Sequence, residues 1–234
     1  MTRTVVVVGG STGIGQAIAE AFARAGDARV VATGHEIGEA DGTPEGVEAR
    51  ALDVREPEAV AAFFAAFERL DVLVNCAGII RRGGAEFRHE GFGEVIDVNL
   101  NGTQRCCEAA HPALRAAQGC IINTASMLTF FGSATSPAYA ASKGGIAQLT
   151  RSLALAWAAD GIRVNALAPG WIETALTAPL GRDAARSRAI LSRTPMGRWG
   201  RPEDLAGPAL FLASPAAAFV TGVILPVDGG YSAA

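Results

Sequence analysis

Seven short runs of apolar, mostly β-branched residues alternate along this 234-residue chain with longer, alanine-rich segments. Most of the runs are nearly continuous in Val, Ile and Leu, which is typical of parallel strands that are buried on both faces of a sheet. This alternation predicts a doubly wound α/β fold, a parallel sheet with helices on both faces. The predicted strands cover residues 4–8, 29–33, 47–52, 71–75, 120–124, 163–168 and 223–227, of which 47–52 has the weakest pattern.

The segments between these strands carry helix signals. Pro57 and Pro202 each stand where a first helical turn accepts proline, and acidic residues that suit the helix dipole follow them. Pro208 lies inside the last pattern and predicts a kink or a broken turn. The predicted helices cover residues 15–26, 56–70, 139–158 and 201–214.

The connection between the second and third strands is unusual. Residues 34–46 include four glycines and one proline, whereas a parallel crossover usually contains a helix. We therefore expect a shortened crossover, a loop or a stub of helix. No internal repeat or linker interrupts the pattern, so residues 1–234 are predicted to form a single domain.

Composition excludes several function classes. The formal net charge of -3, without a basic run, gives no sign of nucleic-acid binding. No segment approaches the roughly 18 apolar residues of a membrane span, and a signal peptide is not evident, so we expect a cytoplasmic protein. The four cysteines, which form no C-x-x-C pair, are predicted to be buried free thiols, and no histidine spacing indicates a metal.

A glycine-rich stretch joins the first strand to the first helix. In GGSTGIG, residues 9–15, the glycines permit a tight turn and a close approach of the backbone to a ligand. The free N–H groups at the start of a helix attract a phosphate. The stretch therefore predicts a dinucleotide site. Asp53 and the segment 75–78 follow other strands, so their side chains should reach the same crevice.

Tyr139 and Lys143 lie four positions apart in YAASK, on a predicted helix, and therefore share one face. Ser126 follows the fifth strand. A phenol with a pKa of about 10 is a poor acid at neutral pH. A cation about 4 Å away contributes roughly 4 kcal/mol toward the phenolate, so we expect Lys143 to lower the pKa of Tyr139.

These residues together resemble the short-chain dehydrogenase/reductase family over nearly the whole chain, with its Rossmann fold. The matching motifs are GGSTGIG, NCAG, VNLNG around Asn99, Ser126, YAASK, APGWIET and VDGG. Val8 and Cys76 depart from the family pattern, which usually has threonine and asparagine there. Neither change removes a catalytic group.

The resemblance implies a catalytic set of Asn99, Ser126, Tyr139 and Lys143. Ser126 would hold the substrate oxygen, Tyr139 would give or take its proton, and Lys143 would also bind the nicotinamide ribose. Asn99 would hold a water in a proton relay. The implied cofactor contacts are Gly9, Ser11, Thr12, Gly13, Ile14, Gly15, His35, Asp53, Val54, Asn75, Ala77, Gly78, Tyr139, Lys143, Pro169, Gly170, Ile172 and Thr174.

The cofactor is predicted to be NAD or NADP. In this family an acid near Gly34 would favour NAD, and an arginine at the position of His35 would favour NADP. This chain has neither, although Glu36 is close by and His35 could donate one hydrogen bond. We favour NAD because no fixed cation is available for a 2′-phosphate.

A closer similarity is to the branch that acts on sugar acids, the 2-deoxy-D-gluconate 3-dehydrogenases and 2-dehydro-3-deoxy-D-gluconate 5-dehydrogenases. It rests on NCAGIIRR, TASMLTFFG and RTPMGRWGRPEDLAGPALFLAS. An independent observation favours an anionic small-molecule substrate, because residues 180–201 contain six arginines and one acid, and guanidinium groups suit carboxylates. The arginines are Arg182, Arg186, Arg188, Arg193, Arg198 and Arg201, and Arg81 and Arg82 can add to them.

Two alternatives remain open at this point. A 3-oxoacyl-carrier-protein reductase shares part of these motifs and would need a basic docking surface. A dinucleotide-binding sensor or scaffold without turnover would have no need of the Ser126, Tyr139 and Lys143 set. The resemblance also implies a dimer or tetramer, built on the two long helices that precede and follow Ser126.

Overall fold

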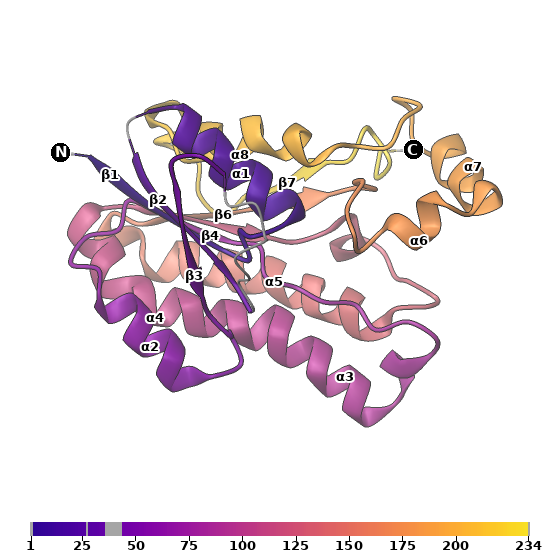
Figure 1. Cartoon of the computed structure of the whole chain (residues 1–234), viewed down its shortest axis with the longest axis horizontal. Helices are drawn as coiled ribbons and strands as arrows, with labels where there is room; N and C mark the ends of the chain where they lie inside the picture. The colour runs from indigo at the N-terminus through magenta and orange to yellow at the C-terminus, as the bar shows by residue number, and fades with distance from the viewer. Residues whose placement is uncertain (1, 27, 36–43, 234) are drawn as a thin grey trace.

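The computed structural model describes residues 2–26, 28–35 and 44–233, and its centre is one seven-stranded sheet (Figure 1). All neighbouring strands pair in parallel. The order β3-β2-β1-β4-β5-β6-β7 reverses between β1 and β4, which confirms the predicted doubly wound fold. The strands are β1 (Arg3–Val8), β2 (Ala28–Gly34), β3 (Val47–Ala51), β4 (Val72–Asn75), β5 (Cys120–Thr124), β6 (Arg163–Pro169) and β7 (Ile224–Val227).

The four predicted helices are present, with some differences in extent. The residue pattern did not predict the helices over His89–Ile96, Gly102–Ala117, Ala178–Gly181 and Ala184–Ser192. The second helix ends at Ala65, earlier than the predicted residue 70. A 3₁₀ turn, Pro202–Leu205, precedes the last helix, so the helical segment around Pro208 is divided. The helices are α1 (Gly13–Arg24), α2 (Pro57–Ala65), α3 (His89–Ile96), α4 (Gly102–Ala117), α5 (Pro137–Ala156), α6 (Ala178–Gly181), α7 (Ala184–Ser192) and α8 (Ala206–Leu212).

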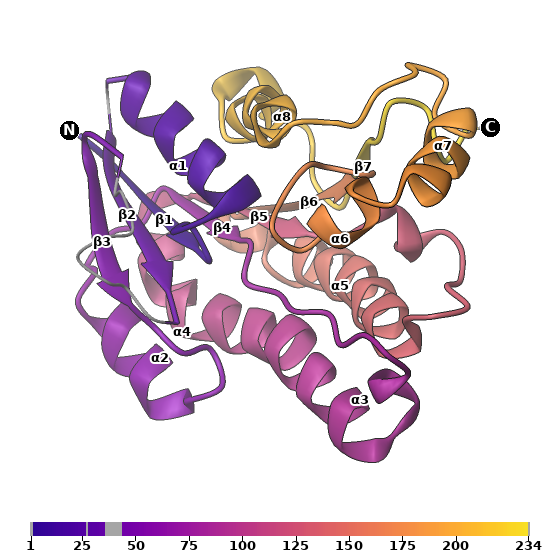
Figure 2. The ribbon, with the colours of Figure 1, turned by 45° about the vertical axis from the view of Figure 1, so that its right-hand side comes forward.

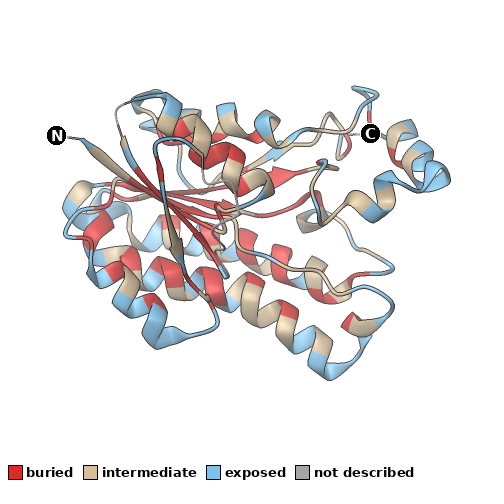
Figure 3. Cartoon of the chain, viewed as in Figure 1, coloured by how far each residue is buried: buried red, intermediate tan, exposed pale blue. Residues whose placement is uncertain are grey.

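The sheet separates two hydrophobic cores. Because side chains alternate along a strand, Val5 and Val7 of β1 pack into one core and Val6 and Val8 into the other. Helices α1 and α8 cover the first face, and α2, α4 and α5 cover the second (Figure 2). Figure 3 shows the strands as an almost continuous buried layer between them. The carboxyl ends of the strands are thereby held in fixed positions.

The predicted shortened crossover joins β2 to β3. Strands β2 and β3 are parallel neighbours, but residues 36–43, where we expect a loop or a stub of helix, lie outside the described residues. The four cysteines are free, and three are buried as predicted, whereas Cys76 is only partly buried. Within the described ranges, none of the helices combines the length and apolarity that crossing a bilayer requires.

Candidate active site

A cleft of about 680 Å³ opens at the carboxyl ends of β1, β2 and β4. This position follows the general rule that open α/β sheets bind ligands where the strand order reverses. We call it the cofactor cleft. Most of the residues predicted to contact the cofactor line it, namely Gly9, Ser11, Thr12, Gly13, Ile14, Gly15, His35, Asp53, Val54, Ala77, Gly78, Tyr139, Lys143 and Thr174.

The glycine loop forms one wall of the cofactor cleft. Gly9 has a φ of 74°, and a Cβ there would lie 2.4 Å from the backbone nitrogen of Ala77. A Cβ on Gly15 would lie 2.1 Å from the carbonyl oxygen of Gly9. Helix α1 begins at Gly13, so the unpaired N–H groups of its first turn lie at this wall. These residues fit the pyrophosphate of a dinucleotide.

The far end of the cofactor cleft holds a small charge cluster. Arg55 donates two hydrogen bonds to the carboxylate of Asp53, one of 2.9 Å from Nε to Oδ1 and one of 2.6 Å from Nη2 to Oδ2. These bonds lower the pKa of Asp53 to about 2. His35 Nδ1 lies 3.3 Å from the same carboxylate. The charge of Arg55 is thus shared with Asp53, and Glu36 lies outside the described residues.

A second cavity of about 710 Å³ adjoins the cofactor cleft. Ser126 lines this second cavity, and Tyr139 lines both. We call it the substrate cavity, because a group bound there lies next to the phenol on one side and to the cleft on the other. The two spaces meet at Tyr139, and Ile14, Thr124, Thr174 and Leu176 also line both.

Tyr139 and Lys143 occupy the first turns of α5 and face the cofactor cleft together, as their spacing predicts. The ammonium nitrogen of Lys143 lies 5.5 Å from the centre of the Tyr139 ring. It donates a hydrogen bond of 2.6 Å to the carbonyl oxygen of Thr124, at the end of β5. The charge is therefore fixed beside the ring by the sheet.

The prediction that Lys143 lowers the pKa of Tyr139 is wrong for this structure. Burial raises the pKa of Tyr139 to about 12, a hydrogen bond with Ser126 opposes the rise, and the charge of Glu86 adds to it. Burial also lowers the pKa of Lys143 to about 8, and an electrostatic interaction with Cys76 partly offsets this shift. Desolvation disfavours the charged form of both groups, and it is the largest cause of both shifts.

Ser126 belongs to a turn that is tied to α5. Its hydroxyl oxygen accepts a hydrogen bond of 3.2 Å from the N–H of Leu128. Its own N–H donates to Oγ1 of Thr129 at 3.3 Å, and this Oγ1 in turn donates to the carbonyl oxygen of Lys143 at 3.0 Å. The three predicted catalytic side chains of Ser126, Tyr139 and Lys143 thus share one rigid support.

Asn99 is buried in a π-helical turn, Asp97–Asn101, between α3 and α4. Its side chain accepts a bond of 2.8 Å from the N–H of Ile79 and donates one of 3.0 Å to the carbonyl of that residue. A third bond of 3.1 Å reaches Oγ of Ser142. Asn99 therefore fixes the backbone of Ile79, next to Gly78 at the cofactor cleft. Its role in holding a water stays a prediction.

Four other predicted cofactor contacts lie elsewhere. Pro169, Gly170 and Ile172 line the substrate cavity, next to the cleft. Asn75 is buried behind the cleft, where its amide nitrogen donates to Oδ1 of Asn123 at 2.9 Å. The strand ends explain both results, because Asn75 is still inside β4, whereas Pro169 ends β6 and Gly170 and Ile172 follow it.

Glu86 is a functional candidate that the sequence analysis missed. It is completely buried. One carboxylate oxygen accepts a bond of 2.9 Å from the N–H of Tyr139, and the other accepts a bond of 2.9 Å from the N–H of Arg81. Negative charge at the start of a helix is favourable. An isolated acid in a loop carries no spacing signal, so only the fold reveals this contact.

The predicted cationic patch is partly present around the substrate cavity. Arg186, Arg193 and the earlier Arg82 line it, with no carboxylate among its described lining residues. Arg198 instead forms two bonds with Asp204, and Arg81 is paired with Glu94 beside the cofactor cleft. The structure brings three arginines together, two of them from the six predicted after Leu180.

A dinucleotide cleft that meets a substrate cavity at a half-buried tyrosine, with a serine and a lysine beside it, defines a nicotinamide-dependent oxidoreductase. A family model described as enoyl-(acyl carrier protein) reductase matches residues 8–232. The 2-dehydro-3-deoxy-D-gluconate 5-dehydrogenase of Bacillus subtilis is 45% identical over 98% of this chain and 94% of its own length.

Two solved structures show the same similarity in three dimensions. A putative NAD(P)-dependent gluconate 5-dehydrogenase from Beutenbergia cavernae, with bound NADP at low occupancy, superposes with a TM-score of 0.91 at 46% identity, covering 99% of this chain and 97% of that one. A gluconate 5-dehydrogenase from Burkholderia cenocepacia, in complex with NADP and tartrate, gives 0.91 at 36% identity, covering 99% and 96%. The chain belongs to the short-chain dehydrogenase/reductase family and is an NAD(P)-dependent enzyme acting on CH–OH groups.

Proposed function

We propose that this enzyme interconverts a secondary alcohol and a ketone on a small sugar acid. The observation that carries the proposal is the position of Tyr139, which lies between the cofactor cleft and a cavity lined by three arginines. Guanidinium groups recognise carboxylates through paired N–H donors. The names of the similar dehydrogenases, which act on gluconate or its deoxy derivatives, support the same substrate class.

In the proposed reaction, Tyr139 donates its proton to the substrate oxygen in reduction and removes it in oxidation. Ser126 binds the same oxygen and, through its hydrogen bond, eases the loss of the phenolic proton. The nicotinamide cofactor, when bound, supplies or accepts the hydride. Lys143 keeps a positive charge beside the phenol below a pH of about 8. Asn99 fixes the backbone of Ile79 at the cofactor cleft.

We infer that NAD is preferred over NADP. The support comes from the charge cluster at the far end of the cofactor cleft, where Arg55 forms an ion pair with Asp53. The solved relatives with bound NADP show that this fold also accepts the 2′-phosphate. Fluorescence titration of the enzyme with each reduced cofactor measures the preference. Equal affinities, or tighter binding of NADPH, would contradict it.

A substrate panel tests the main proposal. The enzyme is assayed with five- and six-carbon keto acids, with neutral ketoses and with a 3-oxoacyl thioester, while oxidation of the reduced cofactor is followed by absorbance. The proposal predicts that the keto acids have the highest kcat/KM. A preference for the thioester would identify a 3-oxoacyl-carrier-protein reductase instead, and a preference for neutral ketoses would reject the sugar acid.

We also infer that the enzyme works in the cytoplasm as a dimer or tetramer. Free cysteines suit a reducing compartment. The oligomer is inferred from the family resemblance, in which α4 and α5 form the subunit contact, and such a contact would cover Leu155 of α5, which is 83% exposed. Light scattering coupled to size-exclusion chromatography would reveal a monomer if this inference fails.

A further inference from the structure

The three arginines of the substrate cavity differ in what their guanidinium groups already bind. Arg82 donates a bond of 2.7 Å to the carbonyl oxygen of Leu176. Arg186 lies 3.4 Å from the carboxylate of Asp183 on the same helical turn. Arg193 has neither kind of partner within the described part of the chain, so its N–H donors are available to a ligand.

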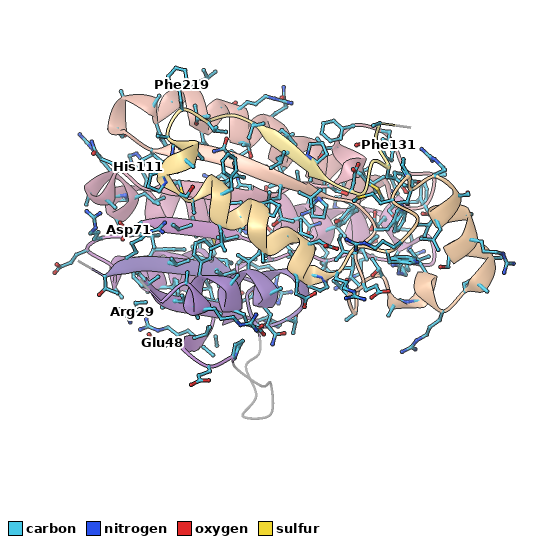
Figure 4. All side chains as sticks on the ribbon, turned by 90° about the horizontal axis from the view of Figure 1, so that it is seen from above. Arg29, Glu48, Asp71, His111, Phe131 and Phe219 are labelled. Atoms are coloured by element: carbon cyan, nitrogen blue, oxygen red, sulfur yellow. The ribbon has the colours of Figure 1, made fainter. Side chains whose placement is uncertain are left out.

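Aromatic rings hold the Arg193 guanidinium at the cavity wall. Its central carbon lies 4.5 Å from the ring centre of Tyr231 and 6.0 Å from that of Phe131. The two rings are themselves 5.9 Å apart, and both line the substrate cavity. Figure 4 shows Phe131 at the end of the molecule that carries α6 and α7. Stacking on a ring face fixes the cation without using its N–H groups.

The backbone on both sides of this stack is also fixed. Arg193 follows the last residue of α7, where a cation is favourable. The N–H of Met196 donates to the carbonyl oxygen of Gly229 at 3.1 Å. A Cβ on Gly229 would lie only 3.0 Å from Cγ2 of Thr194. The segment after α7 is therefore packed tightly against the C-terminal segment that supplies Tyr231.

We propose that Arg193, held on the ring of Tyr231, binds the carboxylate of the substrate and so determines the preference for acids. The proposal rests on the function proposed above and assigns its anion selectivity to one residue. Ser126 and Tyr139 bind the oxygen at the reacting carbon, so Arg193 fixes the opposite end of the molecule. This second point of attachment selects an acid over a neutral ketose of the same length.

The test compares Arg193→Met with Arg188→Met, which removes an equal charge at a residue of α7 that lies outside the cavity lining. A charge-assisted hydrogen bond contributes enough that its loss should raise KM for keto acids about 10- to 100-fold in Arg193→Met. Because the carboxylate is remote from the reacting carbon, kcat should change little. Neutral ketoses should show unchanged kcat/KM in both variants, and Arg188→Met should match the wild type on acids.

A binding measurement separates this inference from the proposed function. Calorimetric titration with tartrate, a dicarboxylate, in the presence of cofactor needs no turnover. Weaker tartrate binding by Arg193→Met supports the carboxylate site even if none of the keto acids tested is a substrate, in which case only the proposed function fails. If keto acids are good substrates and Arg193→Met alters neither their KM nor tartrate binding, the inference is overturned. Equal losses on acids and neutral ketoses overturn it as well.

Discussion

The buried carboxylate of Glu86 accepts a hydrogen bond of 2.9 Å from the backbone N–H of Tyr139, in the first turn of α5. Its other oxygen accepts the N–H of Arg81. The backbone under the phenol is therefore fixed to the loop that follows β4. The same negative charge raises the pKa of the phenol, so Glu86 positions Tyr139 and also affects its acidity.

Glu86→Gln should lower the pKa of Tyr139, because the substitution removes a negative charge that opposes the phenolate. It should also lower the free energy of unfolding by about 1–3 kcal/mol, since the amide cannot accept both backbone hydrogen bonds. The chain has two tyrosines, so ultraviolet titration in a Tyr231→Phe background observes Tyr139 alone. An unchanged or higher pKa would contradict the assigned electrostatic role.

Lys143→Met should stabilise the protein at neutral pH while it impairs turnover. Burial lowers the pKa of Lys143 from 10.5 to about 8, so below pH of about 8 the folded state holds a charge that water would solvate better. The difference between the two pKa values corresponds to about 3 kcal/mol.

The lowered pKa of Lys143 also predicts how the stability of the wild type changes with pH. Between pH of about 8 and 10.5 the unfolded chain binds more protons at this site than the folded one, so the wild type gains stability as pH rises. The advantage of Lys143→Met should therefore shrink across that range in denaturant unfolding curves. A constant or growing advantage would show that Lys143 is not destabilised by burial.

Gly9→Ala should weaken binding of the reduced cofactor. The residue has a φ of 74°, and the added methyl group would lie 2.4 Å from the backbone nitrogen of Ala77. The glycine loop must therefore shift. We expect the Kd for the reduced cofactor to rise at least about tenfold, the equivalent of about 1.4 kcal/mol. Gly207→Ala in α8 is the matched control, because its Cβ would meet open space. A similar Kd for Gly9→Ala and wild type would contradict the assignment of the glycine loop as the pyrophosphate site.

The sequence predicts the strands well because most of them are short, nearly continuous apolar runs, although β3 has a weaker pattern. The doubly wound fold follows from the alternation of these runs with helices. The sequence also brings Tyr139 and Lys143 to one helix face, since that depends only on local spacing. It does not predict which group Lys143 contacts, because the carbonyl of Thr124 comes from β5. The helices α3, α4, α6 and α7 were missed as well. The sequence of α3, HEGFGEVI, contains two glycines, and α4 contains Pro112.

Long-range contacts account for the other differences at the site. Glu86 reaches Tyr139 across 53 positions of sequence, and Tyr231 meets Arg193 from the far end of the chain. The sequence pattern therefore identifies the group of arginines. It does not distinguish Arg193, which lines the substrate cavity, from Arg198, which pairs with Asp204. The degree of burial, which raises the pKa of Tyr139, is likewise a property of the assembled fold.

The central claim is that Tyr139 transfers the substrate proton while the cofactor binds beside it. Tyr139→Phe removes one oxygen and leaves the ring in place, so the Kd for the reduced cofactor should stay close to that of the wild type. Turnover of the best keto acid should fall by about 10²- to 10⁴-fold, the usual contribution of a general acid. The measurement is kcat by cofactor absorbance and Kd by fluorescence on the same preparation. Turnover within tenfold of the wild type, with cofactor binding intact, would contradict the mechanism.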